Sequence, residues 1–468
     1  MNRRLYAGVA RCDVTPPVGI AHGTWSAQVH ERAEGIDLPL WCSALAVSDG
    51  QREAIIAEWD LVYPPDGDWL TQTRKRITDL TGVPGHSIRI SASHTHAGPS
   101  IKPPWFAAGT EMIGPYVGSL TDRLAGACLQ AHRNLEPALL GWGKGSCGVN
   151  CNRRLPQPNR QPIIAPNVHG FTDHEVGVLR IDREDSSPLA VLAHYSAHPT
   201  ILAWDNRLIS PDYPGTLRRT VESLTGSTCL FLQGAAGNQD TIRDFSNKVE
   251  DARWVGRQIG LEAVRVSELI ETQPTRMEIL KTVESSWTVG VTARLKQQIE
   301  PGPVRSVTKR VELPIYKRPP IAAEEVAAVE RLQSRLAELR TEGAPAEDLR
   351  EANRLVRRAA MDLMLARVRA ERESLRIEIQ AMQIGPAALV ATPVEPFAEI
   401  GVEVKARSPF PFTLFSGYSN GAELYLPVAE AYEEGGYEVW MSPFAPAAAA
   451  IVVEESLKLL RHLHQQGE

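Results

Sequence analysis

The segment from Ser87 to Ala92 alternates polar and apolar residues, which predicts a β-strand with one buried face. Alternate side chains of a strand point to the same side, so a continuing strand would place His94 and His96 together at its end. Gly98-Pro99 then breaks the ladder. Two imidazole rings at a sheet edge are costly to bury without partners. The pattern therefore leaves two interpretations open: satisfied core histidines, or a pair that binds a metal ion or stabilises an oxyanion.

Other apolar runs predict strands that end in polar or glycine-rich segments. Residues 189–197 are mostly apolar on both faces, which predicts a buried strand running into His198. Residues 228–232 predict a second buried strand, and the loop from Gly234 to Asn238 follows it. Glycines in such a loop let backbone amide groups approach other atoms closely.

Helical spacing of apolar residues predicts a helix over 69–80 and two long helices within about 322–373, interrupted near Gly343. We interpret the long pair as a helical hairpin that serves as scaffold, with a partner-binding coiled coil as the alternative. Residues 387–391 predict a strand and 397–406 a helix. The fold class expected is α/β, with a mixed β-sheet core, flanking helices and a helical hairpin insertion.

Composition and charge exclude several classes of protein. The chain has 468 residues, with 50 basic and 56 acidic side chains and a formal net charge of -6. Because no basic block stands out, we do not expect nucleic acid as a partner. No stretch approaches the roughly 18 apolar residues of a membrane span. We expect a cytoplasmic protein with free thiols, since the 6 cysteines are few and no secretion signal is evident.

Three residues follow predicted strands, where active sites of α/β folds are usually found. His94 and His198 follow two strands, and Glu395 follows the strand at 387–391. Two histidines and a carboxylate are the ligand set of a hydrolytic zinc site, in which the metal activates a water molecule. Because these residues are far apart in sequence, a core histidine and a solvated helix start stay open as alternatives for His198 and Glu395.

The segment Ser93-His94-Thr95-His96-Ala97-Gly98-Pro99 resembles the SHTHSGP signature of neutral, non-lysosomal ceramidases. Further segments resemble motifs of that family in the same order: Val14-Thr15-Pro16-Pro17-Val18-Gly19, Asn152-Arg153, Ala197-His198-Pro199-Thr200, Pro211-Asp212-Tyr213-Pro214-Gly215, Gln233 to Asn238, and Ala429-Glu430-Ala431-Tyr432 with Tyr437-Glu438. The likeness runs from about residue 6 to residue 440. It implies a single ceramidase-like catalytic domain over residues 1–468, without the C-terminal immunoglobulin-like domain of the larger ceramidases.

The resemblance also implies roles for individual residues. The expected zinc ligands are His94, His198, Glu395 and Tyr432. Tyr425 is a rival for the last place, but the spacing to Tyr437-Glu438 favours Tyr432. By the same resemblance His96 and Arg153 face the substrate carbonyl, where a tetrahedral oxyanion needs fixed donors.

The chain departs from the family pattern at two positions. Asp240 stands where the family has a serine in its glycine-rich loop, and we expect it to act either as a general base or as a loop cap. By spacing, Phe444 replaces the oxyanion-side tyrosine that the family places about three turns of sequence after the zinc tyrosine. The segments Gly23-Thr24-Trp25 and Pro103-Pro104-Trp105-Phe106 are candidates for lining a pocket, with ordinary packing as the favoured alternative.

These expectations favour a zinc-dependent hydrolase that cleaves an amide bond of an N-acyl or ceramide-like small molecule with metal-activated water. A zinc-dependent ester or lactone hydrolase is the first alternative, since it needs the same oxyanion donors. A non-catalytic binding protein on the same fold is the second alternative, suggested by the changes at Asp240 and Phe444. The oligomeric state is left open.

Overall fold

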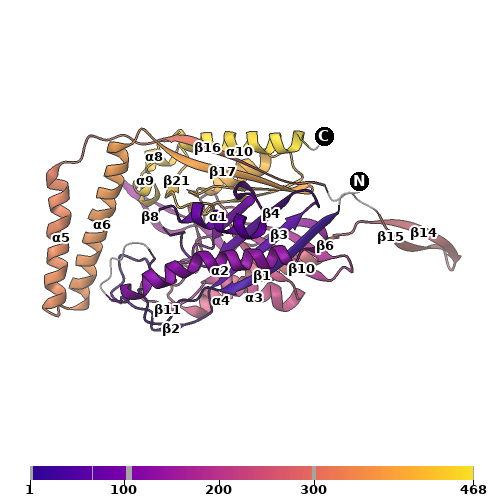
Figure 1. Cartoon of the computed structure of the whole chain (residues 1–468), viewed down its shortest axis with the longest axis horizontal. Coiled ribbons are helices and arrows are strands. Elements are labelled where there is room, and N and C mark those ends of the chain that lie inside the picture. The colour runs from indigo at the N-terminus through magenta and orange to yellow at the C-terminus, as the bar shows by residue number, and fades with distance from the viewer. Residues whose placement is uncertain (1–3, 66, 102–107, 298–301, 467–468) are drawn as a thin grey trace.

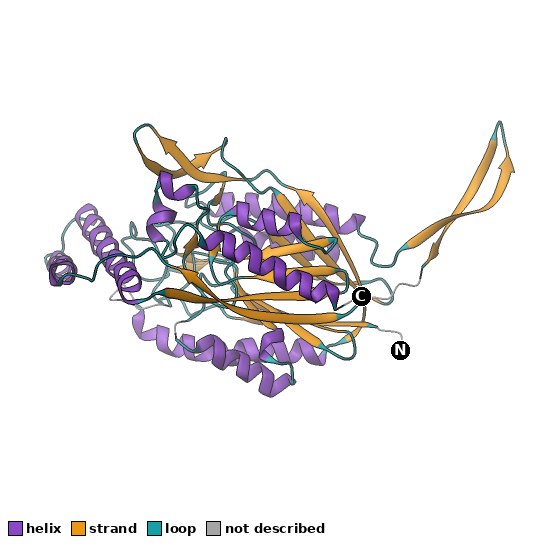
Figure 2. Ribbon diagram, turned by 90° about the horizontal axis from the view of Figure 1, so that it is seen from above, coloured by secondary structure: helices purple, strands orange, loops and turns teal. Residues whose placement is uncertain are grey.

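Two β-sheets lie face to face, and helices cover the outer face of each sheet (Figure 2). The computed structural model describes residues 4–65, 67–101, 108–297 and 302–466. Apolar residues of both sheets form one shared cluster, and three further clusters hold the helices against the outer faces. This arrangement confirms the predicted α/β class with a mixed β-sheet core and flanking helices.

The larger sheet has eight strands of mixed direction. In spatial order they are β12 (Thr228–Gln233), β10 (Pro188–Tyr195), β9 (Glu175–Arg183), β6 (Glu136–Ser146), β1 (Leu5–Asp13), β3 (Trp41–Ser48), β4 (Glu53–Trp59) and β5 (Ile88–Ala92). The pairs β10–β12 and β4–β5 are parallel, and the other neighbours are antiparallel. The parallel strands β5, β10 and β12 lead into the segments that carry the predicted site.

Four helices cover the outer face of the larger sheet: α1 (Trp69–Thr81), α2 (Ile113–Arg133), α3 (Tyr213–Thr225) and α4 (Val249–Leu269). The alternation of strand side chains produces the two faces. In β3, Cys42, Ala44 and Ala46 pack toward the helices, whereas Leu45 and Val47 pack toward the second sheet. Since full burial of a large apolar side chain contributes about 1.5–3 kcal/mol, both interfaces stabilise the fold.

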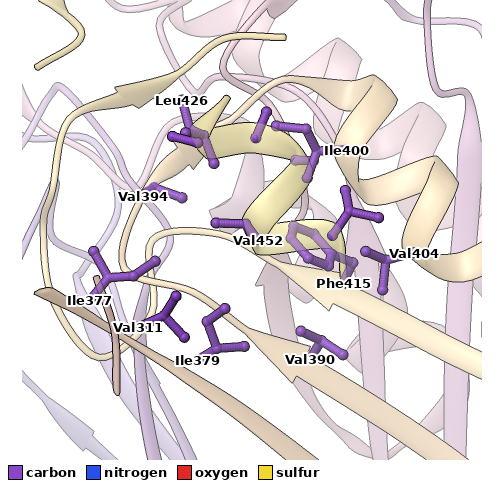
Figure 3. Packing of buried hydrophobic residues seen from close by; sticks show 14 of the residues in the cluster. Val311, Ile377, Ile379, Val390, Val394, Ile400, Val404, Phe415, Leu426 and Val452 are labelled. Atoms are coloured by element: carbon purple, nitrogen blue, oxygen red, sulfur yellow. The ribbon is translucent and has the colours of Figure 1, made fainter. Parts of the chain in front are cut away.

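The second sheet has four strands: β16 (Val304–Pro314), β17 (Ser374–Ile384), β18 (Ala387–Ala391) and β20 (Phe412–Ser416). Helices α7 (Ala398–Arg407) and α10 (Ala448–Gln465) cover its outer face. Figure 3 shows Ile377 and Ile379 of β17 in one cluster with Val404 of α7 and Val452 of α10. This packing fixes the strand β18, which leads into Glu395.

Short ladders and short helices complete the fold. The ladders are β13 (Gln239–Thr241) with β7 (Asn150–Gln157) and β8 (Arg160–Asn167), β19 (Glu395–Pro396) with β21 (Tyr425–Leu426), and β2 (Gly35–Ile36) with β11 (Leu208–Ile209). The short helices are η1 (Gly85–Ser87), η2 (Thr110–Met112), α8 (Ala431–Glu434) and α9 (Tyr437–Met441). Several of the candidate site residues lie on these ladders.

Two elements project from opposite ends of the molecule (Figure 1). One is the ribbon of β14 (Thr275–Glu284) and β15 (Thr288–Lys296), and the other is the helix pair α5 (Ala323–Thr341) and α6 (Ala346–Glu371). The helix pair occupies the segment in which the sequence predicts a helical hairpin. Among the described residues, no helix combines the length and the apolar character needed to cross a bilayer.

Candidate functional site

Strand β5 differs from the sequence prediction in its burial and in its end. All five of its residues are buried, because the segment around Tyr418 to Asn420 covers the strand's free edge through bonds such as Ala92 N to Tyr418 O at 3.0 Å. The strand ends at Ala92, and His94 has a left-handed backbone with φ of 69°. The two histidines therefore do not continue the strand's alternation, although their Nε2 atoms still lie 3.3 Å apart.

Backbone carbonyl groups orient the rings of His94 and His198. The Nδ1 atom of His94 lies 2.6 Å from Val62 O, and that of His198 lies 2.7 Å from Ala236 O. A carbonyl oxygen only accepts, so each Nδ1 carries the proton and each Nε2 keeps a lone pair. This second hydrogen bond is the usual device by which proteins orient metal-binding histidines.

The ladder of β19 and β21 adds a carboxylate and a phenol to the two rings. Glu395 and Tyr425 are register partners on this parallel pair. The Oε2 atom of Glu395 lies 3.2 Å from His198 Nε2 and 3.5 Å from His94 Nε2, and Tyr425 Oη lies 3.4 Å from His198 Nε2. The loop at Gly237 packs directly against the backbone of Glu395. A Cβ atom at position 237 would lie 2.5 Å from Glu395 O, so only glycine allows this close approach.

The distances and the chemistry of this cluster fit a tetrahedral zinc ion. Zinc binds histidine nitrogen at about 2.0–2.1 Å, so its tetrahedral ligand atoms lie about 3.3–3.4 Å from one another. Ring atoms of His94, His96 and His198 also lie within 4.8 Å of one another. We call His94, His198, Glu395 and Tyr425 the acceptor cluster, since its lone pairs converge and repel one another unless a cation lies between them.

The titration behaviour of the cluster follows from burial and proximity. Burial lowers the pKa of His96, and the rings of His94 and His198 lower it further, so that it lies well below its ordinary value. Burial also lowers the pKa of His198, with a further contribution from Arg153. Although burial alone would raise the pKa of Glu395, the adjacent His94 and His198 hold it well below its ordinary value. His96 and His198 therefore favour the neutral ring and Glu395 favours the ionised carboxylate, which are the metal-binding forms.

The structure places Tyr425 at the cluster and gives Tyr432 other partners, which corrects the expected fourth ligand. The hydroxyl of Tyr432 donates to Phe444 O at 2.8 Å and lies 3.2 Å from Ser442 Oγ. Its ring stacks on Tyr316 with centroids 6.5 Å apart. The spacing argument failed because Tyr432 lies in α8, beyond the end of the strand β21 that carries Tyr425.

The same shift corrects the expectation about Phe444, which is fully buried in a hydrophobic cluster. Phe444 lies 12 residues after Tyr432, and the residue 12 positions after Tyr425 is Tyr437. The ring of Tyr437 makes an edge contact with Tyr425 at 5.6 Å, and burial together with Glu395 raises its pKa to about 12. A phenol is therefore present near Tyr425, at the spacing that the family pattern implies once Tyr425 is taken as the ligand.

Arg153 lies beside the acceptor cluster within a network of buried ion pairs. Its Nε donates to Glu438 at 2.8 Å, and its Nη1 donates to Asp240 at 3.1 Å. The guanidinium carbon lies 5.3 Å from the centre of the Tyr425 ring. Arg154 pairs with the other oxygen of Glu438 at 2.7 Å. We call Arg153, Arg154, Glu438, Asp240 and Asp244 the charge network.

Asp240 is part of the site and not an exposed loop cap. Strands β13 and β7 pair Asp240 with Cys151, which brings its carboxylate beside Arg153. The oxygen Oδ1 of Asp240 lies 4.0 Å from His198 Nδ1. Burial raises the pKa of the Asp244 carboxyl well above its ordinary value, and the nearby charge of Asp240 raises it further. Sequence reasoning missed Asp244 because it lies outside the family motifs.

Of the two segments predicted to line a pocket, the structure describes only the one that contains Trp25. The ring of Trp25 lies 5.1 Å from the ring of His96, and the preceding Thr24 hydroxyl lies 2.8 Å from His96 Nδ1. Residues 103–106 lie outside the described residues.

Comparisons with known proteins agree on one family. Residues 5–247 match the family model described as neutral/alkaline non-lysosomal ceramidase, N-terminal. Neutral ceramidase 1 of Arabidopsis thaliana is 24% identical over 224 residues, which are 46% of this chain and 28% of that protein. Neutral ceramidase B of Dictyostelium discoideum is 25% identical over 134 residues, which are 28% of this chain and 19% of that protein. These matches thus span less than a third of either curated relative.

Two solved structures share the fold. A ceramidase complexed with C2 has a TM-score of 0.71 at 19% identity, covering 99% of this chain and 76% of that one. Neutral ceramidase from Pseudomonas aeruginosa has a TM-score of 0.70 at 18% identity, covering 100% of this chain and 75% of that one. At this identity the likeness establishes the fold.

Proposed function

This chain belongs to the neutral/alkaline non-lysosomal ceramidase family, and from that premise we propose that it is a zinc-dependent hydrolase cleaving an amide bond of an N-acyl, ceramide-like substrate. One observation carries the proposal: three contacts of 3.2–3.5 Å link the four ligand-type side chains of the acceptor cluster, from His94 to Glu395, from Glu395 to His198 and from His198 to Tyr425. His94, His198, Glu395 and Tyr425 would hold the metal.

The residues around the acceptor cluster supply what amide hydrolysis requires. When bound, zinc supplies a Lewis acid that polarises the amide carbonyl and lowers the pKa of a water molecule. Arg153 and Tyr437 both contact the ring of Tyr425, and His96 lies beside His94. These three groups are placed to donate hydrogen bonds to the oxyanion that forms when the carbonyl is attacked.

Asp240 supplies the proton transfers in this proposal. Its carboxylate is held by Arg153 and lies next to Asp244. It accepts the proton of the attacking water and later gives a proton to the departing amine. The position that holds serine in the family thus holds a group with different chemistry.

A buried carboxyl group favours an amide over an ester or lactone. An amine leaves only when it is protonated, whereas an alkoxide needs less assistance. Asp240 is the carboxyl group available for this role, and it lies 4.0 Å from His198 of the acceptor cluster. A non-catalytic binding role has less support, since both the ligand-type residues and the oxyanion donors are in place.

The test is a substrate panel for the zinc-loaded protein. Short-chain ceramide analogues and simpler N-acyl amides are compared with esters and lactones of the same acyl groups. We expect turnover of amides that disappears in His198→Ala and persists in His169→Ala, which changes an exposed histidine. Turnover of esters or lactones alone would replace the proposal with the alternative hydrolase. A fully zinc-loaded protein that cleaves none of these would contradict it.

A further inference from the structure

Three aromatic rings from separate loops meet beside His96. Trp25 lies 5.1 Å from the ring of His96, 6.0 Å from Trp204 and 5.6 Å from Phe245. Trp204 and Phe245 are stacked, with centroids 5.9 Å apart and planes at 23°. Trp25 stands nearly perpendicular to both, at 78° and 88°. The rings thus form a corner with two apolar faces, which we call the aromatic corner.

The loop that carries Phe245 is fixed in a conformation that aromatic residues rarely adopt. Phe245 and Asn247 have positive φ values of 56° and 58°. Backbone bonds hold this turn, including Phe245 N to Thr200 O at 3.3 Å and Asn247 N to Ile201 O at 2.9 Å. The side chain of Asn247 also accepts from Asp205 N at 3.1 Å, next to Trp204. Disfavoured backbone held in this way is typical of functional sites.

The projecting helix α6 holds the other two loops. Arg357 donates to the carbonyl oxygen of Trp25, and Asn353 donates to Gln28 O at 3.3 Å. Both side chains are buried against the loop. Arg350, one turn before Asn353, lies 3.6 Å from Asp205. Figure 1 shows α6 as the inner helix of the pair, on the side of the main body.

Exposure around the cluster indicates the side from which a substrate enters. The rings of His94 and His198 are buried, whereas His96 and the three rings of the aromatic corner are half-buried. The indole N–H of Trp25 is also buried and has no hydrogen-bond partner among the described residues, although buried indole groups usually have one. The half-buried rings show that the corner borders the more exposed side of the site.

We propose that the aromatic corner is a binding subsite for a planar apolar group, an aryl acyl group, next to the scissile carbonyl, and that α6 braces it. This inference rests on the proposed amide hydrolysis for its place in the reaction. A planar aromatic group in this corner would stack on one ring face and place its edge against the other. Both contacts are favourable between aromatic rings, and an alkyl chain makes neither of them. The helical hairpin thus acts on specificity and not only as scaffold.

The direct test measures binding without turnover. Phenylacetate and octanoate have the same carbon number, and their affinities for zinc-loaded protein are compared by calorimetry. We expect phenylacetate to bind more tightly than octanoate. Trp204→Ala should weaken phenylacetate binding about tenfold, because the loss of one aromatic contact corresponds to about a tenfold change in affinity. Trp204→Phe should restore most of the affinity for phenylacetate. Trp287→Ala is the matched control, because Trp287 is 83% exposed at the tip of the β14–β15 ribbon.

Kinetics with phenylacetyl amides then separates binding from chemistry. Trp204→Ala is expected to raise KM with kcat and zinc content unchanged, and Arg357→Gln to raise KM in the same direction by less. Equal binding of octanoate, or phenylacetate binding that Trp204→Ala leaves unchanged, would overturn the inference. If phenylacetate binds as expected but no amide is cleaved, the proposed function fails while the subsite stands.

Discussion

The acceptor cluster and the charge network lie side by side, yet they differ in how their charges are balanced. The acceptor cluster presents lone pairs from His94, His198, Glu395 and Tyr425 toward one point and contains no cation of its own. In the charge network, Arg153 and Arg154 face the carboxylates of Glu438 and Asp240, and Asp244 favours its neutral form.

The acceptor cluster needs a cation from outside the chain, whereas the charge network is balanced by residues of the chain itself. Buried charges are stable when paired, so the charge network folds as a complete unit. Burial raises the pKa of Glu438, but Arg153 and Arg154 outweigh this and lower it overall. The acceptor cluster is complete only with a cation. Variants of the two regions should therefore have different effects on metal content and on activity.

The largest effect is expected from His198→Ala, which removes one ring of the acceptor cluster. We expect activity to be lost and zinc affinity to fall by more than the 10–100-fold that is typical of residues behind the ligands. Activity and bound zinc are measured on the same sample, with His169→Ala as control. Full activity without the ring would remove His198 from the ligand set.

Arg153→Lys tests the charge network, because lysine keeps the charge but loses the paired N–H groups that hold Glu438 and Asp240. We expect kcat to fall about 10²–10³-fold, the usual effect of losing an oxyanion donor, with zinc content unchanged. Arg160→Lys on the neighbouring strand is the control, since Arg160 is exposed. Loss of zinc from Arg153→Lys would show that the two regions are not separable.

Asp240→Asn tests the proton transfers while keeping the size of the side chain. We expect kcat to fall about 10²–10⁴-fold, the usual contribution of a general acid or base, with zinc still bound. The pH dependence of kcat is measured alongside. A variant with the kcat of the parent protein would reduce Asp240 to a structural partner of Arg153.

The smallest effect is expected from Asp244→Asn, which should change the free energy of unfolding. Its folded pKa is raised and its unfolded pKa is about 4, so its contribution is fully present below about pH 4 and is lost as pH rises through the folded pKa. Each unit of the raised pKa corresponds to about 1.4 kcal/mol. Asparagine does not titrate, so we expect a flatter curve of unfolding free energy against pH. Identical curves for both proteins would contradict the assigned protonation.

The sequence was sufficient to predict the fold class and the convergence of His94, His198 and Glu395. Apolar periodicity marks strands and helices wherever one face is buried, and family motifs mark the residues near the site. The half-buried character expected of β5 was wrong, because the covering segment around Tyr418 comes from far along the chain. The pattern of residues within one segment does not show which distant segment will cover it.

The choice between Tyr425 and Tyr432 failed for a related reason. Both lie in the same stretch of chain, and sequence spacing does not show which one pairs with Glu395. The ladder of β19 and β21 makes that choice through backbone hydrogen bonds between segments 30 residues apart. Trp25 was a pocket candidate from the sequence, but Trp204 and Phe245 were not, since the three rings come from separate loops.

The most direct test of the account is elemental analysis of metal per chain in the purified protein after incubation with zinc. We expect close to one zinc per chain in the parent protein, far less in His94→Ala, and close to one in His96→Ala, whose ring faces the substrate in this account. Absence of bound metal from the parent protein would contradict the central claim that the acceptor cluster is a zinc site.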